Sequence, residues 1–255
     1  MLRFYYVIIT AVIFNLYFIP QMYYMANHPE KYSEKDCYKA GLKLVNMIKR
    51  RGRISTHVTG QEHLPDQGGY IMYANHQGKY DALGILSSHA EPCTIVMDKE
   101  TSESLINNLF INLIKGKRLD KKDPRQQVRI IQEISEEINQ GRKYLLFPEG
   151  GYTDNQNNLQ TFHNGSFKIP LMTKCPIIPV VIFDSYRAFS INSLRRVKTQ
   201  VHYLEPIYYE EYSNMKTKEL CDLIYNRISH KLNDIQNLNE SESELEEEDL
   251  EELIS

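Results

Sequence analysis

Residues 69–81 read GYIMYANHQGKYD, an apolar run that leads into a histidine and an aspartate five residues apart. The run over residues 69–73 is typical of a β-strand, and an amphipathic helical pattern follows over residues 80–88. Histidine has an unperturbed pKa near neutrality, and a nearby carboxylate holds its tautomer and stabilises its charged form. His76 and Asp81 are therefore candidates for a general base and its orienting partner.

The same alternation of short apolar runs and helical patterns continues along the chain. It predicts an α/β fold with a mixed β-sheet flanked by helices. Pro179 lies inside one apolar run, which predicts an edge strand or a local irregularity there. The predicted strands cover residues 54–60, 69–73, 93–97, 142–147, 177–183 and 198–203, and the predicted helices cover residues 80–88, 102–114, 125–139 and 216–233.

Composition indicates one globular domain with appendages, since 42% of the 255 residues are apolar. The net charge of −3 hides an acidic terminus, because residues 240–255 contain nine acids and no base. Without them, 30 basic residues face 24 acidic ones, a net charge of about +6 that suits an anionic membrane surface or a phosphorylated substrate. We predict membrane-anchoring helices over residues 1–51, a catalytic domain over 52–239, and a tail over 240–255 that is disordered or a fraying helix.

The amino-terminal segment predicts membrane attachment. Residues 4–26 are mostly apolar with tyrosines at both ends, and one crossing needs about 20 residues. Residues 33–51 then start with a capping pattern at Ser33 and Asp36 and form a basic amphipathic helix, which would lie on a bilayer or pack on the domain. Two attachment geometries remain open: a single span with the domain inside, or two helices embedded in one leaflet.

The four cysteines are widely spaced and form no pattern at zinc-ligand spacing. They are expected to be reduced, with Cys175 and Cys221 as core residues. The chain also lacks a glycine-rich loop of the dinucleotide or P-loop type. No metal, cofactor or nucleic-acid partner is expected.

Two further clusters accompany the His/Asp turn. A basic block occupies residues 115–125, and the strand-like run over 142–147 enters Pro148-Glu149-Gly150-Gly151. Together with the proline-bearing run, these blocks resemble the glycerolipid acyltransferase family, in particular bacterial 1-acylglycerol-3-phosphate acyltransferases and their lysophospholipid acyltransferase relatives. The match covers residues 30–210, and it is closest at residues 75–81 (NHxxxxD) and 147–150 (FPEG).

The resemblance implies a glycerol-phosphate acyltransferase-like fold. It also implies that the protein lies at the cell membrane, with its catalytic domain on the cytoplasmic side. It implies transfer of a fatty acyl chain from acyl-CoA or acyl-carrier protein to the free hydroxyl of a lysophospholipid, 1-acyl-sn-glycerol-3-phosphate above all. His76 would then be the base and Asp81 its orienter, and amides near Gly78 would stabilise the oxyanion. The implied ligands of the acceptor phosphate are Lys121 and, in reserve, Lys117, Arg118 and Lys122. The implied ligands of the glycerol hydroxyls are Glu149, Gly150 and Gly151.

The chain departs from the family pattern at two places. Lys121 stands where members commonly have an arginine, and Gly151-Tyr152-Thr153 replaces a stretch that often carries one. Lysine binds phosphate as a point charge, without the bidentate fork of arginine. Two alternatives to the acyltransferase remain: a catalytically silent, membrane-tethered protein that binds lipid or partners, and a hydrolase that delivers the acyl group to water. The chain has no GxSxG elbow, which disfavours a serine hydrolase.

Overall fold

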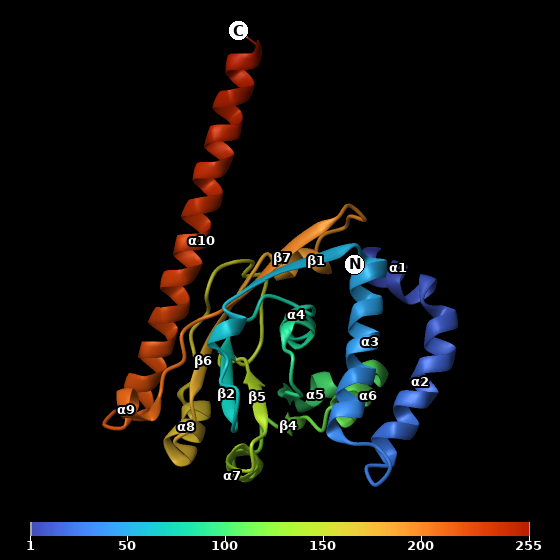
Figure 1. Cartoon of the computed structure of the whole chain (residues 1–255), viewed down its shortest axis with the longest axis vertical. Coiled ribbons are helices and arrows are strands. Elements are labelled where there is room, and N and C mark those ends of the chain that lie inside the picture. The colour runs from blue at the N-terminus through green and yellow to red at the C-terminus, as the bar shows by residue number, and fades with distance from the viewer. Residues whose placement is uncertain (1, 255) are drawn as a thin grey trace.

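The computed structural model describes residues 2–254, with the side chains of all of these except 13, 15, 239, 240 and 242–254. Its centre is a mixed sheet with helices on both faces (Figure 1). The strands are β1 (Ile54–Thr59), β2 (Tyr70–Ala74), β3 (Thr94–Asp98), β4 (Lys117–Leu119), β5 (Lys143–Leu146), β6 (Ile177–Phe183) and β7 (Val197–Tyr203). In the described part of the chain they form one seven-stranded sheet in the order β1-β7-β6-β2-β5-β3-β4.

The five strands from β6 to β4 run parallel to one another, whereas β7 pairs antiparallel with β6 and parallel with β1. Successive residues of β2 point to opposite sides of the sheet, and an apolar core lies against each side. Met72 lies in one core and Ile71 in the other. Burial on both faces explains why β2 and β6 read as unbroken apolar runs.

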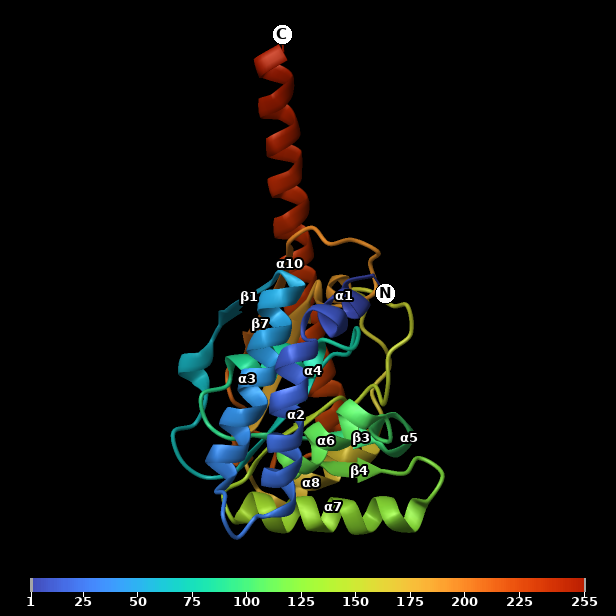
Figure 2. The same cartoon turned by 90° about the vertical axis from the view of Figure 1, so that its right-hand side faces the viewer.

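Helices from the first half of the chain cover one face and helices from the second half cover most of the other. The first core contains residues of α2 (Val12–Asn27), α3 (Glu34–Gly52), α4 (Asp81–Ser88) and α6 (Leu105–Leu113). The second core contains residues of α7 (Pro124–Asn139), α8 (Lys168–Thr173) and α10 (Thr217–Ile254). Figure 2 shows α2 lying along α3, outside the sheet. The remaining helices are α1 (Leu2–Thr10), α5 (Lys99–Ser102), α9 (Tyr209–Tyr212) and the 3₁₀ turns η1 (Gln61–His63), η2 (Asn164–Phe167) and η3 (Ser185–Ala188).

All six predicted strands are present, and the predicted α/β architecture is confirmed. The seventh strand, β4, was not predicted, because it is three residues long and two of them are basic. The predicted helix over residues 102–114 begins one turn late as α6, after the short helix α5. The short helix α8 was also missed, since its six residues carry a proline.

The prediction of an edge position for the strand with Pro179 is wrong. β6 lies inside the sheet, between β7 and β2. The alternative, a local irregularity, is present: Ile177 pairs with Ile207 and Val180 with Tyr203, so the partner chain has one residue more than β6 over this stretch. Such a bulge accommodates the missing N–H of proline in a central strand.

The helix predicted over residues 33–51 packs on the domain and does not present its apolar face to a bilayer. The capping box is present, because Ser33 Oγ accepts from Asp36 N and the Asp36 carboxylate accepts from Ser33 N. Tyr38 and Val45 on the apolar side of α3 are buried in the first core.

The apolar segment over residues 4–26 is divided between α1 and α2, which are separated at Ala11. Within residues 2–254, no helix combines the length and the hydropathy that a membrane crossing requires. At the other end of the chain, α10 continues through the acidic segment to Ile254.

Candidate active site

The candidate active site lies at the carboxyl edge of the parallel strands. His76 follows β2, Glu149 follows β5 and Lys121 follows β4. Since parallel strands end at the same edge of a sheet, the turns that carry these residues meet, as ligand-binding loops of open α/β sheets do. Order along the sheet brings β2 and β5 side by side, so the His76 and Glu149 turns are in direct contact.

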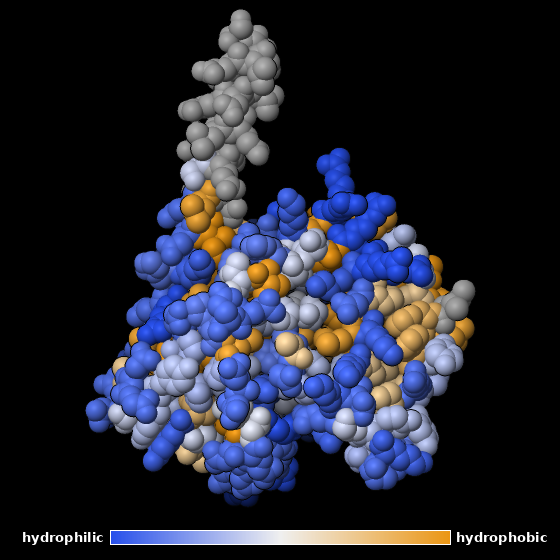
Figure 3. Space-filling view, in the orientation of Figure 1, coloured by the Kyte–Doolittle hydropathy of each residue, from blue (hydrophilic) through white to orange (hydrophobic). Residues whose placement is uncertain are grey.

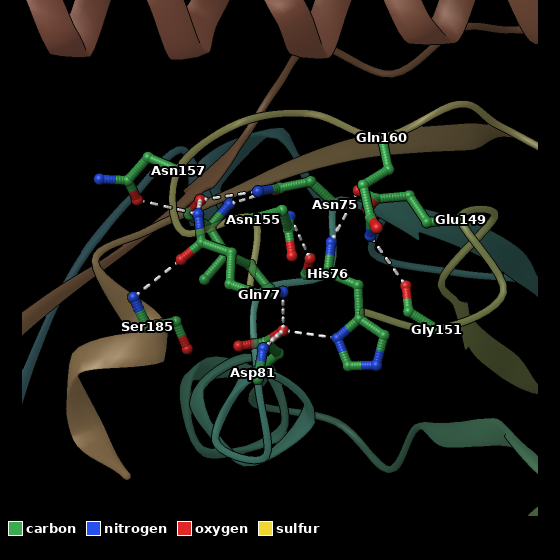
Figure 4. Close-up of polar contacts among 12 residues, drawn as sticks. Asn75, His76, Gln77, Asp81, Glu149, Gly151, Asn155, Asn157, Gln160 and Ser185 are labelled. Atoms are coloured by element: carbon green, nitrogen blue, oxygen red, sulfur yellow. Dashed lines mark hydrogen bonds and ion pairs between the residues drawn. The ribbon is translucent and has the colours of Figure 1, made fainter. Parts of the chain in front are cut away.

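His76 and Asp81 form the pair that the sequence predicts. Asp81 Oδ2 accepts a hydrogen bond from His76 Nδ1 at 2.6 Å (Figure 4). The Asp81 side chain is fully buried, whereas the His76 side chain is 18% exposed. The pair thus has a buried carboxylate behind the ring and an imidazole that solvent can reach.

The tautomer of His76 follows from the other contacts of Asp81. Oδ2 of Asp81 also accepts from the backbone N–H groups of Gln77, at 2.5 Å, and Gly78, at 2.8 Å. Because Oδ2 acts as an acceptor in all three contacts, Nδ1 of His76 carries the proton, and in the neutral imidazole the lone pair is then on Nε2. These contacts also correct the prediction for the oxyanion, because the Gly78 amide already donates to Asp81.

The turn between β2 and α4 is tied to the end of β6. Asn75 exchanges two hydrogen bonds with the Ile182 backbone, at 2.7 and 2.9 Å. Gln77 donates to the Ile182 carbonyl and accepts from Ser185 N, each at 2.9 Å. A Cβ on Gly78 would lie 3.4 Å from Tyr186 Cα, so the turn also passes close to the backbone of η3. These contacts hold the His/Asp turn rigidly at the sheet edge.

Two aromatic rings enclose the imidazole. Phe147 stacks on His76 with ring centroids 4.2 Å apart, and Tyr152 meets it edge-on at 4.7 Å. Phe147 ends the strand-like run, and Tyr152 lies in the stretch where the chain departs from the family pattern. The rings restrict His76 to one orientation, with Nδ1 towards Asp81.

Both carboxylate oxygens of Glu149 have hydrogen-bond partners within the protein. Its Oε1 accepts from His76 N at 2.9 Å and its Oε2 accepts from Gln160 Nε2 at 2.5 Å. The residue is 7% exposed, and burial raises the pKa of Glu149 to about 7. Oε1 therefore holds the backbone of His76 in place, and Oε2 links Glu149 to Gln160. Gly150, with φ +71°, turns the chain there, and a Cβ would come within 3.0 Å of the His163 ring.

A pH-dependent stability is expected from Glu149. Its pKa of about 7 exceeds the ordinary value of 4.5, so the folded protein binds this proton more tightly than the unfolded chain does. The protein should lose up to about 3 kcal/mol of its free energy of unfolding as the pH rises from about 4.5 to about 7, at roughly 1.4 kcal/mol per unit. Glu149→Gln should lack this part of the slope. Denaturant titrations at several pH values measure the free energy of unfolding of both proteins. The same pH dependence in the wild type and in Glu149→Gln would contradict a raised pKa for Glu149.

A polar loop between Gly151 and Phe162 covers the His/Asp turn, and sequence reasoning missed it. Asn155 donates to the His76 carbonyl at 3.1 Å, Asn157 accepts from Gln77 at 3.0 Å, and Gln160 joins Glu149 to the Gly151 carbonyl. Figure 4 shows these amides over the turn. The only signal in the sequence is the run of amide residues in TDNQNNLQ over 153–160, which by itself indicates a loop.

Lys121 is the basic residue that the structure brings to the edge of the site. A Cβ on Gly151 would lie 3.9 Å from Lys121 Nζ. The ammonium pairs with Asp98 Oδ2 at 3.1 Å and its side chain is 53% exposed. It is therefore positioned beside the Glu149 turn and accessible to an anionic ligand.

Two of the three reserve cations of the basic block, Lys117 and Arg118, are held by partners on neighbouring helices. Lys117 is paired with Glu133 at 3.0 Å and Glu137 at 2.7 Å, both on α7. Arg118 points to the other face of β4, where it donates to Asn108 and Asn112 of α6 at 2.8 and 2.7 Å. The two side chains lie on opposite faces of β4, because neighbouring residues of a strand alternate, and each is occupied by its own partners.

Comparison with known proteins identifies the family. The acyltransferase family model matches residues 55–183, half of the chain, and this stretch contains the His76, Lys121 and Glu149 turns. The chain belongs to the acyltransferase family. It is 28% identical over 160 residues to the 1-acyl-sn-glycerol-3-phosphate acyltransferase alpha of Mus musculus, covering 60% of this chain and 55% of that protein. It is 27% identical over 191 residues to the 1-acyl-sn-glycerol-3-phosphate acyltransferase of Borreliella burgdorferi, covering 70% and 72%.

This acyltransferase spans about half the length of the mammalian relatives that it matches. Its fold resembles the crystal structure of the 1-acyl-sn-glycerophosphate (LPA) acyltransferase, PlsC, from Thermotoga maritima, with a TM-score of 0.67 and 20% identity over 88% of this chain and 97% of that one. All four cysteines are buried and free, Cys175 and Cys221 in the second core as predicted. Among the described residues no cluster of three or more His, Cys, Asp or Glu is arranged to hold a metal ion.

Proposed function

We propose that this acyltransferase moves a fatty acyl chain from acyl-CoA or acyl-carrier protein to the free glycerol hydroxyl of 1-acyl-sn-glycerol-3-phosphate, giving phosphatidic acid. The observation that carries the proposal is the His76–Asp81 pair, with a hydrogen bond of 2.6 Å between a fully buried carboxylate and a partly exposed ring. The names of the mammalian and bacterial relatives support the acceptor.

The geometry supports a direct transfer. The acceptor hydroxyl gives its proton to His76 Nε2 as its oxygen attacks the thioester carbonyl carbon, and Asp81 stabilises the imidazolium that forms. The C–S bond then breaks, and the leaving thiolate takes the proton from the imidazolium. A thioester is already activated, so the reaction requires no covalent acyl-enzyme, and a positioned base typically contributes about 10² to 10⁴ in rate.

The acceptor phosphate is assigned to Lys121 on this proposal. Its ammonium lies beside Gly151 and is half-exposed, and it would exchange Asp98 for the phosphate. Lys121→Ala should raise KM for 1-acyl-sn-glycerol-3-phosphate about tenfold, the lower end of the effect of a hydrogen bond to a charged group, with little change in kcat. Lys122→Ala is the matched control, because Lys122 pairs with Glu100 and its side chain is 81% exposed. Equal effects of the two substitutions would exclude Lys121 as the phosphate ligand.

We also propose that α1 and α2 attach the protein to one leaflet of the cell membrane, with the catalytic domain on the cytoplasmic side, where both donors occur. Large apolar side chains of these helices are exposed, including Ile9 at 70%, Leu16 at 73% and Tyr17 at 71%. Figure 3 shows hydrophobic surface on this side of the molecule, over α2. Exposed apolar faces flanked by tyrosines are typical of helices at a bilayer interface.

The experiment that tests the function is an acceptor screen with the full chain in detergent micelles. Thiol release from acyl-CoA or acyl-carrier protein is followed while lysophospholipids with different headgroups are supplied, and the products are identified by mass spectrometry. The proposal expects release that depends on 1-acyl-sn-glycerol-3-phosphate and yields phosphatidic acid. Release without any lipid acceptor would indicate a hydrolase, and no release with any acceptor would indicate the catalytically silent alternative.

A further inference from the structure

A cleft separate from the His76 site opens between the amino-terminal helices and the end of α3. It has a volume of about 550 Å³ and is lined by Tyr6 of α1, Phe14 of α2 and three arginines, Arg50, Arg51 and Arg53. A smaller hollow of about 110 Å³ shares Tyr6, Arg51 and Arg53 with it and extends to Leu194. The larger volume falls within the range of small-molecule sites, roughly 300 to 1,000 Å³.

The arginines of this cleft lack acidic partners. All three are exposed, and within the described part of the chain the arginine–carboxylate ion pairs form elsewhere. The sequence explains this, because residues 1–29 and 37–61 contain neither aspartate nor glutamate. Three uncompensated guanidinium groups around one cleft favour an anionic ligand with several oxygen acceptors, and phosphate matches the guanidinium fork.

Helix stability alone does not account for these residues. Basic side chains in the last turn of a helix stabilise its dipole, which suffices for Arg50 and Arg51. Arg53 follows the helix at φ 52°, in the left-handed region that favours glycine. An arginine at this position is strained and brings a third guanidinium to the same cleft.

The surroundings of the cleft indicate a lipid and not a soluble acidic partner. The two helices that contribute Tyr6 and Phe14 to the cleft, α1 and α2, also carry exposed apolar side chains, among them Leu2 at 50% and Val12 at 48%. In Figure 3 hydrophobic surface over α2 borders hydrophilic residues near the end of α3. An apolar face beside a cationic cleft matches acyl chains beside a phosphate, as at the surface of an anionic leaflet.

The helix that borders the cleft is also attached to the catalytic domain. Arg3 of α1 is fully buried and donates to the carbonyls of Arg187 and Ala188 at 3.0 and 2.8 Å. The next residue, Phe4, lies under the ammonium of Lys79, 5.1 Å from the ring centroid, and Lys79 belongs to the His/Asp turn. A ligand held against α1 is therefore rigidly placed relative to His76.

We propose that the cleft between α1, α2 and the end of α3 binds the phosphate headgroup of an anionic phospholipid, which is not the reacting acceptor. This site shares no lining residue with the candidate active site, and the proposal does not depend on the acyltransferase activity. Bound lipid would fix the orientation of the domain on the leaflet.

A single-tryptophan probe tests the proposal, since the chain contains no tryptophan. Tyr6→Trp places the fluorophore in the cleft of the full-length protein. We expect a saturable fluorescence change with dihexanoyl phosphatidylglycerol below its critical micelle concentration, and a much weaker one with dihexanoyl phosphatidylcholine or inorganic phosphate. An equal response to phosphatidylcholine would overturn the anionic site, and an equal response to inorganic phosphate would overturn the lipid as its ligand.

Charge removal in the same background provides the second arm. Arg50→Gln, Arg51→Gln and Arg53→Gln together should weaken phosphatidylglycerol binding about a hundredfold, from roughly fivefold for each arginine near a surface. The matched control removes three exposed lysines on the α8 and α10 side, Lys174→Gln, Lys216→Gln and Lys218→Gln, and should leave binding unchanged. If the triple arginine variant does not fold, Arg50→Gln alone should still weaken binding about fivefold. Unchanged binding in the arginine variants, or an equal loss in the lysine control, would overturn the proposal.

Discussion

His76→Ala should lower kcat for acyl transfer about 10³-fold, within the range of about 10² to 10⁴ for loss of a positioned general base. In the proposed mechanism Nε2 of His76 accepts the proton, because Nδ1 donates to the buried Asp81. Alanine at this position has no group that can take the proton of the acceptor hydroxyl. Thiol release under saturating donor and acceptor measures the loss.

The control for this substitution is His230→Ala on α10. The His230 side chain is 81% exposed and its contact is an ion pair with Asp234. The substitution His230→Ala should leave kcat unchanged. A far-ultraviolet circular dichroism spectrum and a melting curve must show that the His76 variant is folded, and a folded variant with wild-type kcat would refute the base assignment.

Asp81→Asn should lower kcat by about 10² to 10⁴ while leaving the fold intact. Oδ2 of Asp81 accepts all the hydrogen bonds that the side chain makes, and Oδ1 has no partner among the described residues. Asparagine can therefore keep its oxygen at the Oδ2 position and place its amide where Oδ1 was. The contacts survive, but the negative charge that stabilises the imidazolium is lost.

The stability cost of Asp81→Asn should stay near about 1 to 3 kcal/mol, because the new amide is buried without an acceptor. Asp123→Asn is the matched control: Asp123 also accepts from two backbone N–H groups at a helix start, those of Arg125 and Gln126 at 3.0 and 3.1 Å. Asp123 has no histidine partner, so the Asp123→Asn variant should keep full activity. If the two variants are equally active, Asp81 is a helix cap and not the partner of a base.

Local patterns predicted most of the helices and strands and the contact between His76 and Asp81. The run before Asn75 is apolar because β2 is buried on both faces, and His76 and Asp81 are only five residues apart, across one turn. Contacts this short depend on the turn itself and need no knowledge of the rest of the fold. The capping box at Ser33 was predicted for the same reason.

Contacts between distant segments could not be predicted. Glu149 meets His76 across 73 residues, and Asn155 reaches the His76 carbonyl across 79. Those contacts arise because β2 and β5 are neighbours in the sheet, a pairing that periodicity does not reveal. The apolar face of α3 was likewise ambiguous, since a bilayer and a protein core bury the same side chains.

The amino-acid sequence by itself determined the α/β class and the His76–Asp81 pair, and it offered the basic block as candidates for the proposed phosphate ligand. Only the tertiary structure shows how the surroundings of those basic residues differ. Lys117 is neutralised by carboxylates of α7 and Arg118 is bound to amides of α6, whereas Lys121 stays accessible beside Gly151. The physical reason is that the charge of a side chain can be read from the sequence. The groups that pair with that charge come from distant segments of the chain, which only folding brings into contact with it.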